Sequence, residues 1–242
     1  RVKVMLRDFI FNFFDYRVIV PGEIARKTIC EKWGYNKKLC FLPNLINGSL
    51  YHVESRPKLG KKIKLLTIAR LEEADKGIIN FIRMAGSDLL SKFDWVIAGD
   101  GPDMDKLAVL ISELNLNKNI CLLGNKPPAE VKQLYADSDV FLLPSLSDPN
   151  PLTVIEALHA GLVVLLSTRC GNVSEAVREG GNGFSFDPVD KTSVQERLKL
   201  ILDNTDNLEA MSFVSRSVAG ENFDLVRNVS KFLEQLYLAD SI

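Results

Sequence analysis

The sequence predicts an α/β protein in which a doubly wound, parallel, six-stranded sheet of Rossmann-like type is joined to a fragment of a second αβ domain. From residue 62 to about residue 205, short apolar runs rich in β-branched residues alternate with stretches that carry apolar residues at helical spacing. Such alternation is typical of parallel sheets with right-handed crossovers. The short runs are apolar throughout, which favours strands that are buried on both faces.

The six predicted strands span residues 63–69, 95–98, 120–123, 140–143, 163–166 and 184–186. Helices are predicted after the first four strands because apolar residues recur there at helical spacing; they cover residues 78–89, 104–114, 131–135 and 152–160. Two further helical stretches, residues 208–218 and 225–238, follow the sheet.

The first 52 residues contain a shorter version of the same pattern. Residues 2–14 and 24–33 are predicted helices, and residues 17–20 and 39–42 are predicted strands. This is about one βαβ unit, which is too small to bury its own sheet. We therefore interpret the chain as the second part of a longer protein. Its expected parts are the tail of an amino-terminal domain, a basic linker, the main domain and carboxy-terminal helices that return to the first domain: residues 1–52, 53–61, 62–205 and 206–242.

Composition excludes several classes of function. The 242 residues include 30 Lys and Arg against 31 Asp and Glu, a formal net charge of −1, whereas nucleic-acid binding requires a surplus of positive charge. No run of about 18 apolar residues predicts a membrane-spanning helix. The two histidines cannot complete a metal cluster with the four widely spaced cysteines. The cysteines are interpreted as the reduced thiols of a cytosolic protein.

Polar residues and glycines follow the predicted strands at the edge where a parallel sheet binds its ligands, outside the carboxyl ends of the strands. Arg70 and Lys76 follow the first strand, and Asp148 and Asn150 follow the fourth. The loops after the second and third strands supply Gly99, Gly101, Pro102, Gly124, Asn125 and Lys126. The combination suits a phosphorylated, hydroxyl-rich ligand, whereas a basic residue or a glycine of this kind, taken alone, is more often a solvated charge or a simple turn residue.

Three common motifs are missing from this sequence. The run from Gly99 to Met104 ends in Met where the dinucleotide fingerprint needs Gly or Ala, and it follows the second strand rather than the first. A nicotinamide enzyme is therefore not expected. The chain contains neither the G-x-x-x-x-G-K-[ST] loop of P-loop NTPases nor the G-x-S-x-G elbow of α/β-hydrolases.

The helix predicted at residues 152–160 is expected to begin with an anion site. Asn150 is predicted to cap it and Pro151 to occupy its first position, so that the amides of Leu152 and Thr153 face the edge of the sheet. A helix amino terminus carries a partial charge of about +0.5, and it binds anions. With the two basic residues after the first strand, this arrangement suits a diphosphate.

Two carboxylates lie near this helix start. Asp148 precedes the helix and Glu156 lies inside it, where carboxylates suit the hydroxyls of a sugar and a ribose. For Asp148, ordinary turn chemistry within Ser-Asp-Pro-Asn-Pro is the alternative interpretation.

Taken together, the motifs resemble those of the group 1 retaining glycosyltransferases of GT-B fold. They occur in the family's order and spacing across residues 62–190: Ala69-Arg-Leu…Lys76-Gly, Ala98-Gly-Asp-Gly-Pro102, Leu123-Gly124, Tyr135-Ala-Asp-Ser-Asp-Val-Phe-Leu-Leu-Pro-Ser145, Asp148-x7-Glu156-Ala-Leu-His-Ala-Gly161, Gly171-Asn-Val-Ser-Glu175 and Gly181-Asn-Gly-Phe184. Pro21-Gly-Glu-Ile and Leu42-Pro-Asn44 resemble the end of the family's amino-terminal domain. The resemblance implies that residues 62–205 form the donor-binding domain and residues 1–52 the tail of the acceptor-side domain.

The resemblance also implies a role for each matching residue. Arg70 and Lys76 would hold the donor diphosphate and neutralise it as it leaves. Asp148, where the family usually has Glu, would contact the donor sugar, and Glu156 would bind the ribose. The other positions would approach the donor, flank its base or face its phosphates: Gly99, Gly101, Pro102, Gly124, Asn125, Lys126, Asn150, Leu152 and Thr153. Asn150-Pro151 replaces the family's usual aromatic–glycine pair, so one phosphate-facing amide is absent.

The implied function is transfer of a hexose from a UDP-sugar or GDP-sugar to a saccharide or lipid-linked acceptor, with retention of anomeric configuration, in polysaccharide biosynthesis. No metal or other cofactor is expected, and the 242-residue chain alone is expected to be inactive. The expected location is the cytoplasm, with peripheral association at the inner face of the membrane through the missing domain. The alternatives are a non-catalytic nucleotide-sugar-binding module and a nucleotide-sugar epimerase of GT-B type.

Overall fold

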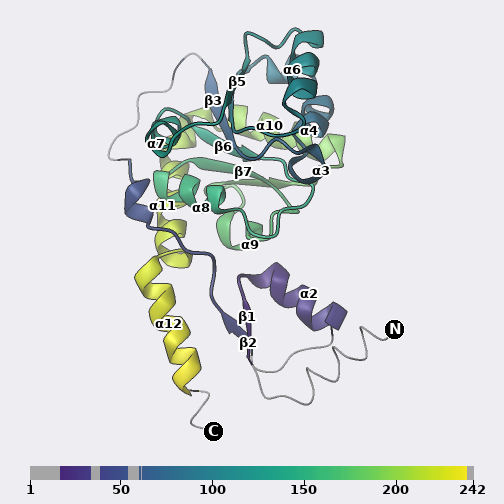
Figure 1. Ribbon diagram of the computed structural model, residues 1–242. Helices are drawn as coiled ribbons and strands as arrows, with labels where there is room; N and C mark the ends of the chain where they lie inside the picture. The colour runs from purple at the N-terminus through teal and green to yellow at the C-terminus, as the bar shows by residue number, and fades with distance from the viewer. Residues whose placement is uncertain (1–16, 34–38, 54–59, 61, 239–242) are drawn as a thin grey trace.

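The computed structural model describes residues 17–33, 39–53, 60 and 62–238. Its larger part is built on a six-stranded sheet in the order β5-β4-β3-β6-β7-β8, in which all neighbouring strands are parallel (Figure 1). The strands are β3 (Ile63–Ile68), β4 (Phe93–Ala98), β5 (Ile120–Gly124), β6 (Val140–Leu143), β7 (Val163–Ser167) and β8 (Gly183–Phe186). The predicted sheet is therefore confirmed, and the strand order reverses between β3 and β6.

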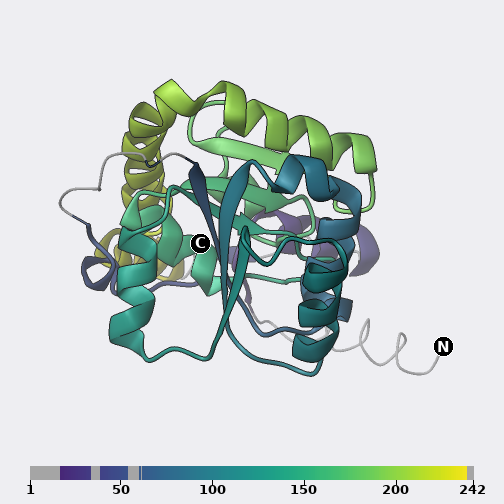
Figure 2. The same cartoon turned by 90° about the horizontal axis from the view of Figure 1, so that it is seen from above.

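Helices cover both faces of this sheet (Figure 2). One face is covered by α4 (Ile78–Ala85), α5 (Ser87–Leu90), α6 (Met104–Glu113) and α10 (Lys191–Asp203). The opposite face is covered by α7 (Pro128–Ala136) and α8 (Leu152–Ala160). Four further α-helices follow β3 along the chain: α3 (Glu73–Lys76), α9 (Val173–Ala176), α11 (Leu208–Asn222) and α12 (Leu225–Leu238).

The helix predicted at residues 78–89 is wrong in one respect. Gly86 has φ at 82°, which is not a helical conformation, so α4 ends there and α5 begins after it. Glycine adopts this conformation readily, whereas it is strained for residues with a Cβ. Helices α3, α9 and α10 were not predicted from the sequence. The first two are four residues long, too short for an apolar periodicity to be visible.

Side chains of the strands alternate between two cores. Leu65 and Leu142 lie in the core beneath α4, α6 and α10, whereas Leu66 and Phe141 lie in the core beneath α7 and α8. All four are 0% exposed. This alternation follows from the period of two in a β-strand, and it explains why most positions of the strands are apolar.

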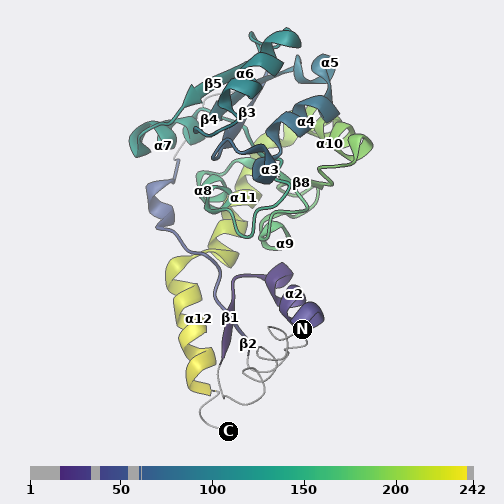
Figure 3. The same ribbon diagram turned by 45° about the vertical axis from the view of Figure 1, so that its right-hand side comes forward.

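A second, two-stranded parallel sheet lies beside α12 (Figures 1 and 3). It comprises β1 (Val18–Val20) and β2 (Leu39–Phe41), joined by α2 (Glu23–Trp33). The Gln235 carboxamide on α12 accepts a hydrogen bond from the Phe41 amide at 2.9 Å and donates one to the Phe41 carbonyl at 3.4 Å. The helix predicted at residues 2–14 and most of the linker predicted at residues 53–61 lie outside the described residues.

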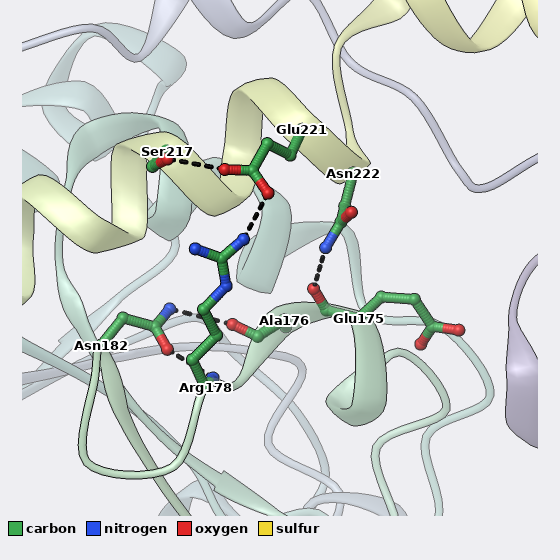
Figure 4. Close-up of polar contacts among 7 residues, drawn as sticks. All are labelled: Glu175, Ala176, Arg178, Asn182, Ser217, Glu221 and Asn222. Carbon is green, nitrogen blue, oxygen red and sulfur yellow. Dashed lines mark hydrogen bonds and ion pairs between the residues drawn. The ribbon is translucent and has the colours of Figure 1, made fainter.

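The junction of α11 and α12 is attached to the segment that follows β7 (Figure 4). The Asn222 side chain, at the end of α11, donates a hydrogen bond to the Glu175 carbonyl at 2.7 Å. Nearby, the Arg178 guanidinium pairs with the Glu221 carboxylate. The carboxylate of Glu175 in turn accepts a hydrogen bond from the Glu23 amide at the start of α2, at 2.6 Å. Glu175 therefore contacts both α11 and the smaller sheet's helix.

The smaller sheet is expected to open more readily than the larger one. Strands β1 and β2 have 3 residues each, and an isolated pair of strands is marginally stable in water. In a hydrogen-exchange experiment, amides of residues 17–33 and 39–53 should therefore exchange faster than those of the six-stranded sheet. Uniform protection across both parts would contradict this prediction.

Candidate functional site

A cleft of about 720 Å³ opens at the carboxyl ends of β3, β4 and β5. It is lined by the end of β3, by the loops after β3, β4 and β5, and by the first turn of α8: Ile68, Ala69, Arg70, Gly99, Asp100, Gly101, Asn125 and Thr153. Five of these residues are among those predicted from the sequence, and they come from segments more than 80 positions apart. The cleft lies next to the point between β3 and β6 where the strand order reverses, which is where open α/β sheets bind ligands.

Two glycines shape this cleft by bringing backbones together. A Cβ on Gly99 would lie 1.9 Å from the Ala69 carbonyl oxygen, and a Cβ on Gly101 would lie 2.3 Å from the Leu71 carbonyl oxygen. Gly99 also has φ at 129°, which an L side chain rarely adopts. The glycines are therefore required by the packing of the β4 loop against the β3 loop, a role that was not predicted from the sequence.

Three other predicted residues lie at the same edge. The Gly124 carbonyl accepts a hydrogen bond from the Gly99 amide at 2.8 Å, which ties the β5 loop to the β4 loop. Lys126 pairs with Glu130 on α7 at 3.0 Å, and Pro102 is exposed beside Gly101. Neither Lys126 nor Pro102 is among the residues that line the cleft.

The two basic residues after β3 differ in their surroundings. The Arg70 side chain is 70% exposed and lies 3.4 Å from the Glu72 carboxylate, so water solvates most of its charge. Lys76, at the end of α3, is 20% exposed. Its ammonium donates a hydrogen bond of 2.5 Å to the Asp148 carboxylate, which is 10% exposed. Two of the predicted site residues are therefore already paired with each other.

The loop after β6 is held against the loop after β7. Asp148 and Cys170 form a parallel bridge, and the Gly171 amide donates a hydrogen bond to the Asp148 carbonyl at 2.8 Å. A Cβ on Gly171 would lie only 1.6 Å from the Pro149 carbonyl oxygen. The two contacts hold the backbone of Asp148 and Pro149 against the β7 loop. No role for Gly171 was predicted from the sequence.

The predicted cap of α8 is wrong. The helix begins at Leu152 with Pro151 at the N-cap position, and no side chain caps it. Pro151 has ψ at 120°, an extended conformation, so the helix starts one residue later than predicted and Asn150 is too far back to cap it. Instead, the Asn172 side chain, 1% exposed, donates a hydrogen bond to the Pro151 carbonyl at 3.0 Å.

The start of α8 nevertheless lies at the cleft. Thr153 lines the cleft, and Leu152 is 45% exposed beside it. Because the amides of a first helical turn have no partners within the helix, the start of α8 can hold an anion there. The Oδ1 atom of Asn150 is buried without a hydrogen-bond partner among the described residues.

Glu156 lies one turn into α8 and is held by two tyrosines. Tyr51 donates to one carboxylate oxygen at 2.9 Å, and Tyr135 donates to the other at 2.7 Å. Burial raises the pKa of Tyr51 to about 12, and it raises the pKa of Tyr135 well above the usual value, so both hydroxyls keep their protons at neutral pH. Neither tyrosine was assigned to the site from the sequence, although Tyr135 begins one of the motifs quoted above.

Within the described residues, no helix has the length and hydropathy needed to cross a membrane, and no group of three or more His, Cys, Asp and Glu could hold a metal ion. All four cysteines lie in that part of the chain and are free of disulfides. Burial raises the pKa of the Cys170 thiol, next to Asp148, to about 12.

Comparison with solved structures defines the class of fold. The crystal structure of Anabaena Alr3699/HepE in complex with UDP superimposes with a TM-score of 0.82 at 19% identity, over 100% of this chain and 68% of that chain. The chain therefore has the fold of GT-B glycosyltransferases.

The family model "Glycosyl transferases group 1" matches residues 52–217, and the chain belongs to this family. The putative colanic acid biosynthesis glycosyltransferase WcaL of Salmonella typhimurium is 29% identical over 175 residues, which cover 68% of this chain and 42% of that protein. The UDP-Gal:alpha-D-GlcNAc-diphosphoundecaprenol alpha-1,3-galactosyltransferase of Escherichia coli is 31% identical over 153 residues, covering 63% and 38%. These matches span less than half the length of either relative.

Proposed function

We propose that this chain is the donor-binding part of a retaining glycosyltransferase that uses a nucleoside-diphosphate sugar. The observation that carries the proposal is the cleft at the carboxyl ends of β3, β4 and β5, which the first turn of α8 also lines. A cleft of about 720 Å³ is large enough for a nucleotide. The Anabaena structure with a similar fold is a complex with UDP, which is consistent with a uridine nucleotide as donor.

The proposed mechanism is electrostatic. As the bond between the sugar and the diphosphate breaks, negative charge develops on the departing diphosphate. Arg70, Lys76 and the amides at the start of α8 would stabilise that charge in place, and such preorganised stabilisation is often the largest catalytic term. These groups supply positive charge without a metal ion, so we propose that transfer does not depend on one. Asp148 would contact the sugar once the diphosphate competes for Lys76.

The proposed acceptor is a saccharide or a lipid-linked saccharide. The name of the Escherichia coli relative describes a diphosphoundecaprenol-linked acceptor, and that of the Salmonella typhimurium relative describes colanic acid biosynthesis. A lipid-linked acceptor would require the whole protein to work at the inner face of a membrane. We further propose that the 242-residue chain alone binds donor without transferring sugar, because its matches span only 42% and 38% of the length of these two relatives.

A binding experiment tests the first part of the proposal. Calorimetry with UDP, GDP and ADP should show binding of at least one diphosphate, and the matching nucleoside should bind more weakly because it lacks the charges. Absence of binding by all three would contradict the donor site. Incubating the chain with the corresponding nucleotide sugar and an acceptor saccharide tests the second part: robust transfer would contradict the proposed inactivity, and a rearranged free nucleotide sugar would indicate an epimerase.

A further inference from the structure

The segment that leads into β3 packs on α8 and contacts Glu156. This segment contains the short 3₁₀ helix η1 (Gly48–Leu50) followed by Tyr51. Gly48 lies against the ring of His159, where a Cβ would come within 2.2 Å of the imidazole. Glu156 and His159 are three positions apart on α8, so they lie on one face of the helix. The entering segment therefore touches α8 at two successive positions of that face.

Tyr51 is held in this position by its ring as well as by its hydroxyl. Its ring meets the ring of Tyr135 edge to face, with centroids 5.7 Å apart and an interplanar angle of 88°. Tyr51 packs against the core beneath α7 and α8, together with Ile46 and Val53 from the same segment. The ring contact fixes where the Tyr51 hydroxyl lies, and the hydroxyl contacts one oxygen of the Glu156 carboxylate.

The two tyrosine hydroxyls leave part of the Glu156 carboxylate unused. An ionised carboxylate offers about four lone-pair sites, and the tyrosines take one on each oxygen. Glu156 is not among the residues that line the cleft, but Thr153, which does line it, lies three positions earlier on α8, so the two share one face of the helix. The remaining lone pairs of the carboxylate are therefore placed to accept hydrogen bonds from two hydroxyls of a ligand in the cleft, such as the neighbouring hydroxyls of a ribose. Because both oxygens are already engaged, the plane of the carboxylate is set before a ligand arrives.

We propose that Tyr51 is a positioning residue that orients Glu156 toward the ribose hydroxyls and thereby gives the chain its preference for ribonucleotides. This proposal rests on the donor site proposed above. It assigns to the segment before β3 a role in selecting the ligand, in addition to its role as a connection. The oriented carboxylate recognises the two hydroxyls and not the base or the phosphates.

The test compares UDP with 2′,3′-dideoxy-UDP by calorimetry, and the GDP and ADP pairs are tested in the same way. The parent chain should bind the ribonucleotide more tightly, because only the ribonucleotide donates to Glu156. Tyr51→Phe keeps the ring and removes the hydroxyl. It should reduce the preference for the ribonucleotide by about 2- to 10-fold, the range of one hydrogen bond. Binding of the dideoxy nucleotide should stay unchanged.

Two further variants separate orientation from a general structural effect. Tyr237→Phe removes the hydroxyl of an exposed tyrosine on α12 and should leave the preference unchanged. In a Glu156→Gln background, adding Tyr51→Phe should have a much smaller effect than it has alone, since the oriented carboxylate is already gone.

Several outcomes would overturn the proposal. Equal weakening of both nucleotides by Tyr51→Phe would mean a structural role only, and an unchanged or increased preference would mean that Tyr51 does not orient Glu156. A parent chain that binds UDP without distinguishing the dideoxy form would remove the ribose role of Glu156 while leaving the donor site intact. A parent chain that binds none of the three diphosphates would contradict the donor site itself.

Discussion

Replacing Lys76 with alanine is expected to lower the affinity for a nucleoside diphosphate by about 10- to 150-fold, since one charge-assisted contact worth roughly 1.5–3 kcal/mol is lost. Binding of the nucleoside alone should not change, because Lys76 is assigned to the phosphates. The loss should shrink at high salt, where exposed charges are screened. Calorimetry with UDP and uridine at two salt concentrations measures all three effects.

The same substitution is expected to destabilise the fold, since it leaves the Asp148 carboxylate, 10% exposed, without its cation. We expect the free energy of unfolding to fall by about 2–4 kcal/mol. Breaking a fully buried ion pair costs about 3–5 kcal/mol, and the expected cost is lower here because Lys76 keeps some exposure. Lys106→Ala is a matched control: Lys106 also pairs with an aspartate, Asp103, at 2.6 Å, but its side chain is 74% exposed. Denaturant titration should show a much smaller loss for the control.

The role of Lys76 would be wrong if Lys76→Ala weakened uridine binding as much as UDP binding. The double variant Lys76→Ala, Asp148→Asn distinguishes the two effects of the substitution. Removing the unpaired charge of Asp148 should restore part of the lost stability. It should not restore the affinity for UDP, because the contact to the diphosphate is still missing.

Gly171→Ala is expected to have the second large effect. The added Cβ would meet the Pro149 carbonyl oxygen at 1.6 Å. The loops after β6 and β7 would therefore have to separate, and with them the hydrogen bond between Gly171 and Asp148. Overpacking of this kind costs about 1–3 kcal/mol or more where a backbone must shift. The melting temperature should fall, and UDP should bind more weakly because the Asp148–Lys76 pair moves.

Gly220→Ala makes the same chemical change with the opposite expected sign. Gly220 is an exposed residue within α11, and a Cβ there would meet nothing within 4 Å. Replacing a glycine in the middle of a helix by alanine stabilises a protein by about 0.5–1 kcal/mol. An unchanged melting temperature for Gly171→Ala, or a decrease for Gly220→Ala, would contradict this account of the two glycines.

Most of the fold could be predicted from the sequence because its strands are largely apolar and its main helices carry periodic apolar residues. Residues that follow each strand could also be predicted to meet at one edge, since parallel strands end on the same side. Arg70, Gly99, Gly101, Asn125 and Thr153 meet there as expected. Whether these residues bind a donor stays a prediction.

The contacts between loops could not be predicted. The pairing of Lys76 with Asp148 joins residues 72 positions apart, through a four-residue helix that leaves no periodic pattern. The capping role given to Asn150 failed because local preference suggested a side-chain cap, whereas the extended backbone of Pro151 moved the helix start. Tyr51 lay in a segment with no recognisable pattern, and only the folded chain brings it to Glu156, 105 positions away.

The contact between Gln235 and Phe41 has a consequence for the outer edge of β2. A carboxamide presents an N–H and a C=O much as a peptide group does, so Gln235 occupies the position of one residue of a third strand. A strand from another molecule could pair with β2 at this residue only by displacing it, and such blocking is one way proteins prevent edge-to-edge aggregation. Because Gln235 follows Phe41 by 194 residues, this edge of β2 has no side chain of α12 to pair with until that helix has been synthesised.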